Sequence, residues 1–144
     1  MPNSWVCVDA SLIVKLVVEE PHSLQVRALW RTWQYEGSVA TAPPLLRYEL
    51  ASVLRKHVAR GFRTTAESRQ ALERALAFDI RYQEPPNFHL QAFDLADRLG
   101  RSAAYDAHYL ALAEYLACEF WTADERLVNA VQDMLPWVKW LGQL

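Results

Sequence analysis

The sequence has few cysteines, no long uncharged stretch and no excess of basic residues. Cys7 and Cys118 are its only two cysteines, and each lies within an apolar segment. In a reducing compartment such cysteines are typical of small core side chains rather than of a disulfide or a metal pair. The longest stretch without a charged residue, 37–46, has ten residues and is too short to cross a bilayer. We therefore predict neither a disulfide scaffold nor a membrane protein.

The start of the chain shows no signal peptide. Met1-Pro2-Asn3 carries no basic residue, and Asp9 interrupts the apolar run that follows. We therefore expect a cytoplasmic protein. A length of 144 residues fits one domain, 1–144, that can bury a sizeable core.

The net charge of −2 is not that of a typical nucleic-acid-binding domain, which is basic overall. Residues 45–63, however, contain five bases and one acid, which gives this segment a charge of +4. At the helical period, Lys56 and Arg60 follow Glu49 along one line beside an apolar face. A carboxylate at the head of a basic stripe could hold a metal beside a phosphate track. The same stripe could instead be a solvated face with ordinary ion pairs.

Short apolar segments alternate with amphipathic ones along the chain. We predict strands at residues 5–8, 38–41, 119–122 and 137–141. We predict helices at residues 11–20, 23–35, 45–60, 65–78, 104–117 and 125–134, and one on Ala92, Phe93, Ala96 and Leu99 that ends at Gly100. Strands separated by helices predict an α/β fold with a parallel sheet covered on both faces, where ligands bind beyond the carboxyl ends of the strands.

Four acidic residues occupy positions that are unfavourable for a carboxylate. Asp9 and Asp124 follow predicted strands, Asp106 begins an apolar helix stripe, and Glu49 lies beside an apolar helix face. Removing a carboxylate from water costs several kcal/mol unless a cation compensates it. Oxygen ligands without a Cys or His cluster favour magnesium or manganese over zinc. The sequence therefore predicts a site for a hard cation, and such ions usually act on phosphates.

Each of these acids also has a purely structural explanation. Asp9 could cap the helix after it, Asp106 could interact with a helix N-terminus, and residues 122–125 have the Thr-x-x-Glu form of a capping box. Capping alone, however, does not require inward-facing acids at the same edge of one sheet. The histidines form no nucleophile arrangement with Ser or Cys, and we expect them on the surface or in the core: His22, His57, His89 and His108.

The order of the four acids resembles that in the PIN-domain ribonucleases. The matching segments are Val8-Asp9-Ala10-Ser11, Tyr48-Glu49-Leu50, Tyr105-Asp106-Ala107 and Thr122-Ala123-Asp124. A short chain of this kind is most similar to the toxins of VapBC toxin–antitoxin pairs. The resemblance implies a PIN-like three-layer α/β/α fold with a central, mainly parallel sheet and magnesium-dependent endoribonuclease activity.

The resemblance also implies roles for individual residues. The metal-binding and catalytic acids would be Asp9, Glu49, Asp106 and Asp124, with Ser11 and Thr122 as supporting hydroxyls. One or two magnesium ions, or manganese, would activate water for cleavage of an RNA phosphodiester, so no protein nucleophile is required. Lys56 and Arg60 would guide the RNA backbone, whereas Lys15 and Arg47 receive no role.

A nuclease that cleaves cellular RNA needs restraint, and the resemblance implies a small antitoxin that covers the cleft. We also expect a homodimer. Trp30 and Trp33 form a helical stripe that could serve the core, the dimer or an antitoxin groove, and helical aromatic stripes are most often buried.

Three other functions fit parts of the sequence. A PIN endonuclease of RNA maturation would have the same site without toxicity. A receiver-like or phosphatase-like domain would also bind magnesium, but Asp9-Ala10-Ser11 lacks the second acid of an Asp-x-Asp motif, and no acid follows residues 38–41. An inactive module would bind RNA or a partner without cleaving RNA.

Overall fold

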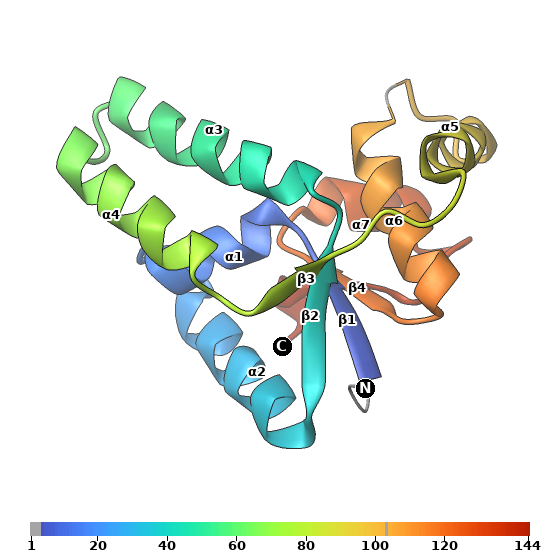
Figure 1. Cartoon of the computed structure of the whole chain (residues 1–144), viewed down its shortest axis with the longest axis horizontal. Helices are drawn as coiled ribbons and strands as arrows, with labels where there is room; N and C mark the ends of the chain where they lie inside the picture. Colours follow the sequence, from blue (N-terminus) through green and yellow to red (C-terminus); the bar gives the residue numbers. More distant parts are fainter. Residues whose placement is uncertain (1–3, 103) are drawn as a thin grey trace.

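A computed structural model describes residues 4–102 and 104–144 of the chain. Within these residues, a five-stranded parallel sheet lies between layers formed by seven α-helices (Figure 1). The strands are β1 (Ser4–Val8), β2 (Ser38–Ala42), β3 (Ile80–Tyr82), β4 (Glu119–Thr122) and β5 (Val138–Trp140). The helices are α1 (Ala10–Val17), α2 (Ser23–Glu36), α3 (Leu45–Ala59), α4 (Thr65–Leu76), α5 (Phe88–Arg98), α6 (Tyr105–Leu116) and α7 (Glu125–Val131), and a 3-10 turn at Leu141–Gln143 follows β5.

The sheet order β3-β2-β1-β4-β5 places the first strand in the centre. Strands β2 and β3 lie on one side of β1, and β4 and β5, which come later in the chain, lie on its other side. This change of side makes the boundary between β1 and β4 a topological switch point, where open α/β sheets bind ligands. Val8 pairs with Trp121, so the residues that follow them, Asp9 and Thr122, reach the same edge of the sheet.

Helices cover both faces of the sheet. On one face, α1 packs against α2, α3 and α4, and α2 contacts β2. On the other face, α6 packs against β1 and β4 and is covered by α5. The α3 and α4 helices pair and extend away from the sheet (Figure 1). The predicted three-layer α/β/α architecture is therefore confirmed.

Strand β3 was not predicted from the sequence. It has only three residues, and of these only Ile80 is buried, so its hydrophobic pattern is too short to stand out. Its backbone pairs with β2 from Ala40 to Ala42, and Thr41 Oγ1 adds a hydrogen bond of 2.7 Å to the carbonyl of Arg81. A sheet edge of this kind depends on the neighbouring strand rather than on local sequence.

Several predicted boundaries are wrong by a few residues. The helix predicted at 11–20 ends at Val17, because Val18 is extended and Ser23 Oγ bonds to the backbone of Val18 and Glu20 in place of another helical turn. The helix predicted at 125–134 ends at Val131, and the strand predicted at 137–141 spans Val138–Trp140. Phe93, placed on the apolar side of its helix, is 67% exposed.

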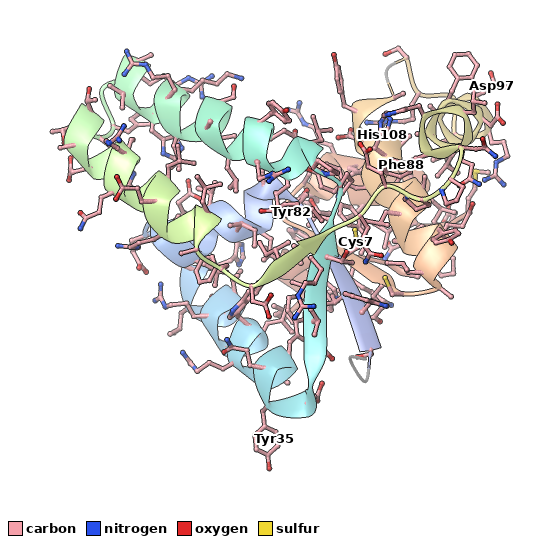
Figure 2. All side chains as sticks on the ribbon, viewed as in Figure 1. Cys7, Tyr35, Tyr82, Phe88, Asp97 and His108 are labelled. Atoms are coloured by element: carbon pink, nitrogen blue, oxygen red, sulfur yellow. The ribbon has the colours of Figure 1, made fainter. Side chains whose placement is uncertain are left out.

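The aromatic stripe on α2 belongs to the core, as expected. Trp30 and Trp33 are buried and contact each other edge to face, and Trp33 also contacts Trp121 from β4. Cys7 is buried on β1 (Figure 2), and neither Cys7 nor Cys118 forms a disulfide.

Of the helices in the described part of the chain, none is long and apolar enough for a membrane span. The expected absence of a signal peptide rests partly on residues 1–3, which lie outside the described residues.

Candidate metal centre

A cleft of about 320 Å³ opens at the carboxyl edge of the sheet, where β1 and β4 meet α3 and α6. Its walls include the four acids singled out in the sequence: Asp9, Glu49, Asp106 and Asp124. Ser11, Lys15, Glu20 and Tyr109 complete its polar lining. Segments that are up to 115 residues apart in sequence therefore share one surface, as the switch-point topology requires.

The Asp9 carboxylate accepts three hydrogen bonds in this cleft. It caps α1, because its Oδ1 accepts a 3.1 Å hydrogen bond from the backbone N–H of Leu12. Ser11 Oγ donates to the same oxygen over 2.6 Å, and Thr122 Oγ1 donates to Oδ2 over 2.5 Å. Both hydroxyl protons are directed to one carboxylate, so Ser11 and Thr122 do support Asp9.

The backbone of the β4–α7 junction holds these two hydroxyls in place. The N–H of Ala123 donates to Ser11 Oγ over 2.9 Å, and the N–H of Asp124 donates to Thr122 Oγ1 over 3.0 Å. Each hydroxyl therefore accepts from β4–α7 and donates to Asp9 at the end of β1. The network links the two strand ends that form the switch point.

Burial makes the ionised forms of Asp9 and Glu49 unfavourable. Burial raises the pKa of Asp9 to about 6. Hydrogen bonds from Ser11, Thr122 and the backbone oppose this shift, and the charge of Glu49 adds to it. Burial also raises the pKa of Glu49, and the charge of Asp106 adds to that shift. A cation near these carboxylates would favour their ionised forms and reverse both effects.

Glu49 has a partner that was not found from the sequence. Tyr109 on α6 donates its hydroxyl hydrogen to Glu49 Oε1, and its ring packs against Phe120 in the core. Burial raises the pKa of Tyr109 far above its ordinary value, so the phenol remains a donor. Tyr109 lies one helical turn after Asp106, and this i, i+3 spacing was the available signal.

The place of Asp106 on the apolar stripe of α6 predicted a side chain that points into the protein interior. The structure places it at the surface of the cleft instead. Its side chain is 44% exposed at the cleft, and its Oδ2 lies 3.2 Å from Nη2 of Arg101. Arg101 precedes α6 in an irregular segment, so helical or strand periodicity gave no reason to select it. Its ion pair with a predicted metal ligand makes it part of the site.

Asp124 caps the helix α7, which was the structural alternative to its predicted role as a metal ligand. It is exposed, and its Oδ1 accepts a 3.1 Å hydrogen bond from the N–H of Leu127, which caps α7. The capping box that residues 122–125 offered as a structural alternative does not form, because Asp124 is the cap and Thr122 donates to Asp9. The structure contains such a box at α4 instead, between Thr64 and Glu67.

Basic residues lie at two distances from the cleft. Lys15 lines it and is 3.5 Å from Glu20, which His57 also approaches at 3.8 Å. Lys56 on α3 and Arg60, the residue that follows α3, are exposed and do not line the cleft. At the helical rise they lie about 10 and 16 Å along the axis from Glu49. Their predicted contact with the RNA backbone remains a prediction.

Two histidines contact each other beside this region. His89 Nδ1 and His108 Nε2 are 2.9 Å apart, and the ring of Phe88 packs against both. Figure 2 shows Phe88 close to His108. They join the first turns of α5 and α6. His89 is exposed and His108 is partly buried.

The donors in the cleft suit a hard divalent cation. They are carboxylate and hydroxyl oxygens, which magnesium and manganese prefer, and a cation would offset the burial that raises the pKa values of Asp9 and Glu49. In the described residues, no group of three His, Cys, Asp or Glu side chains is arranged to hold one ion. The acids instead bind hydroxyls, a phenol and an arginine.

A three-layer α/β/α domain with clustered acids at the switch point of a parallel sheet defines the class of this protein. The family model of the PIN domain matches residues 6–132, and the chain belongs to the PIN-domain family. No curated protein sequence matches the chain significantly.

Two solved structures share the fold. PAE2754 from Pyrobaculum aerophilum has 24% identity and a TM-score of 0.62, with 88% of this chain and 79% of that chain covered. VapC20 from Mycobacterium tuberculosis, a toxin that cleaves the sarcin-ricin loop, has 14% identity and a TM-score of 0.62, with 82% of this chain and 87% of that chain covered. At these identities the likeness concerns the fold.

Proposed function

We propose that this PIN-domain protein is a magnesium-dependent endoribonuclease and the toxin of a type II toxin–antitoxin pair. The observation that carries the proposal is the cluster of Asp9, Glu49 and Asp106 in one cleft, where burial and like charge raise the pKa of two of them. Such a cluster is unfavourable without a cation and suited to one. The likeness to VapC20, whose substrate is RNA, supports RNA as the substrate class.

Some side chains of the cleft would bind the ion, and others would hold those ligands in position. Asp9, Glu49 and Asp106 would bind magnesium or manganese, with Asp124 as a fourth acid. When bound, the ion would supply a water of lowered pKa and Lewis-acid stabilisation of a phosphodiester. Ser11 and Thr122 favour the ionised form of Asp9, and Tyr109 fixes the direction of one Glu49 oxygen.

The proposed partners follow from the charge of the cleft. Acids without a cation attract a basic group, so an antitoxin tail would present an arginine, which can bind two carboxylate oxygens at once. Lys56 on α3 and Arg60 directly after it, both exposed, would guide the RNA backbone. A single domain, a homodimer and a cytoplasmic location remain parts of this proposal.

Other functions make different predictions. A PIN endonuclease of RNA maturation would cleave RNA without arresting growth. An inactive binding module would bind RNA or a protein without cleavage. Membership of the PIN family disfavours the receiver-like and phosphatase-like alternatives.

The test is cleavage of end-labelled single-stranded RNA by the purified protein, with magnesium and with chelator. We expect fragments only with magnesium and none from Asp106→Asn, while Asp133→Asn, an exposed acid after α7, cleaves like the wild type. Full cleavage by Asp106→Asn would contradict the metal site. Induction in cells, with and without a neighbouring small gene product, separates a toxin from a maturation enzyme by growth arrest and its relief.

A further inference from the structure

A second hollow of about 550 Å³ adjoins the acidic cleft. Glu49 and Asp106 line both, so the two spaces meet at these carboxylates. The remaining lining residues of the hollow are Gly100, Arg101, Ser102 and Tyr105. A substrate that passes through the cleft would extend into this space.

The end of α5 fixes the position from which Arg101 extends. Gly100 has φ +66°, the left-handed conformation that glycine adopts readily after a helix. The N–H of Gly100 donates to Asp97 over 3.1 Å, and the N–H of Arg101 donates to Ala96 over 2.9 Å. These two bonds form a Schellman motif, which orders the Arg101 backbone although its side chain reaches solvent.

The guanidinium of Arg101 retains unused donors. Among the described residues, its polar contact is made by Nη2, which lies 3.2 Å from Asp106 Oδ2. Its side chain is 31% exposed, so Nε and Nη1 can reach a second acceptor. A planar guanidinium with free N–H groups suits a phosphate, which it can bind through two oxygens.

Tyr105 presents an aromatic ring in the same hollow. It is 68% exposed at the first residue of α6, next to Asp106 in sequence. Proteins that bind single-stranded RNA stack its bases on exposed aromatic side chains and hold its backbone with basic ones. Arg101 and Tyr105 provide one group of each kind beside the proposed cleavage centre.

We infer that this hollow is a nucleotide subsite, in which Arg101 binds a phosphate of single-stranded RNA and Tyr105 stacks on a base. The inference rests on the proposed nuclease function. Without a cation, Arg101 neutralises Asp106. A divalent cation on Asp106 would compete with Arg101 for the same carboxylate, and Arg101 would then be free to bind the RNA.

The first test measures binding of a fluorescein-labelled single-stranded RNA of ten nucleotides by anisotropy. Calcium, a hard cation with oxygen ligands, replaces magnesium, and a gel checks that the RNA stays intact. We expect Arg101→Gln to weaken binding about tenfold, which corresponds to one charge-assisted contact. Tyr105→Ala should weaken it by a similar factor through loss of stacking.

Arg98→Gln is the matched control. Arg98 also pairs with an acid of α6, Glu114 at 3.5 Å, but it lies outside both hollows. Equal RNA affinity of Arg101→Gln and Arg98→Gln, with a wild type that binds and cleaves, overturns the subsite alone. A wild type that neither binds nor cleaves RNA overturns the subsite and the nuclease together.

The second test needs no RNA. Isothermal titration with manganese should show severalfold tighter binding by Arg101→Gln than by the wild type, because the competing charge on Asp106 is gone. Arg98→Gln should bind manganese like the wild type. An unchanged or weaker manganese affinity of Arg101→Gln overturns the release of Arg101 by the cation.

Discussion

The β1–α1 and β4–α7 junctions use the same local structure for different purposes. In each, an aspartate follows the strand, caps the next helix and accepts a hydrogen bond of 3.1 Å from the backbone three residues later. Asp9, however, also receives two hydroxyl hydrogen bonds and has a pKa raised to about 6, whereas Asp124 is exposed.

The difference shows that a capping pattern does not exclude a chemical role. The cap uses one carboxylate oxygen and leaves the other available. At Asp9 the second oxygen is bound by Thr122 from the neighbouring strand, and burial makes the charge unfavourable. At Asp124 the structure provides no such enclosure. Function should therefore depend much more on Asp9 than on Asp124.

The largest expected effect is the loss of cleavage in Asp9→Asn. Asparagine can keep the cap and most of the shape but removes the charge that a divalent cation needs. Because changes to outer partners of a metal already cost about 10- to 100-fold, loss of a ligand should cost more than about a hundredfold. RNA cleavage rates and circular dichroism of the folded protein check this. A folded Asp9→Asn protein with normal cleavage would remove the distinction between the two junctions.

The next effect is a dependence of stability on pH in metal-free buffer. A carboxyl whose pKa is higher in the folded state stabilises the fold below its unfolded pKa and loses that contribution as pH rises through the folded value. For Asp9, stability should fall between about pH 4 and pH 6, by at most about 3 kcal/mol. Glu49 contributes in the same direction.

Urea unfolding with chelator at several pH values measures this effect. The part of the pH dependence of the unfolding free energy that is lost in Asp9→Asn comes from Asp9. The part that remains comes from other groups. Asp9→Asn should also be more stable than the wild type above pH 6. An identical pH dependence of both proteins would show that Asp9 is no less hydrated in the folded state than in the unfolded one.

Thr122→Ala should have an intermediate effect. Its hydroxyl donates to the Asp9 carboxylate rather than to the end of α7, so its removal leaves a partly buried charge with one partner fewer. Hydrogen bonds to charged groups contribute about 1.5–3 kcal/mol, more than an ordinary helix cap. Urea unfolding at pH 7 checks the value. Rescue by Thr122→Ser, which keeps the hydroxyl, would distinguish a lost hydrogen bond from lost packing.

The sequence could predict the fold and the meeting of four acids at one edge of the sheet, because both follow from residue types and their positions in the elements. The family resemblance named Thr122 as a supporting hydroxyl, but residue types alone could not assign Thr122 to Asp9, because that contact depends on the pairing of Val8 with Trp121 across two distant strands. Local pattern alone favoured a capping box there. Arg101 was missed for a different reason, since its position depends on the left-handed Gly100 rather than on any periodicity.

The smallest effect is expected for Asp124→Asn. Asparagine caps a helix about as well as aspartate, so thermal melts should be nearly unchanged. If Asp124 also binds the cation, cleavage should fall about tenfold at low magnesium and recover partly at high magnesium or with manganese.

A magnesium titration of cleavage for Asp124→Asn, beside the wild type and Asp133→Asn, decides between the two roles. Asp133 is an exposed acid after α7, so its replacement changes the same charge without touching the cleft. A right-shifted titration in Asp124→Asn alone would make both strand-end aspartates ligands despite their different burial. A titration that coincides with both controls would leave Asp9, Glu49 and Asp106 as the metal site, because Asp124 then acts only as the cap of α7.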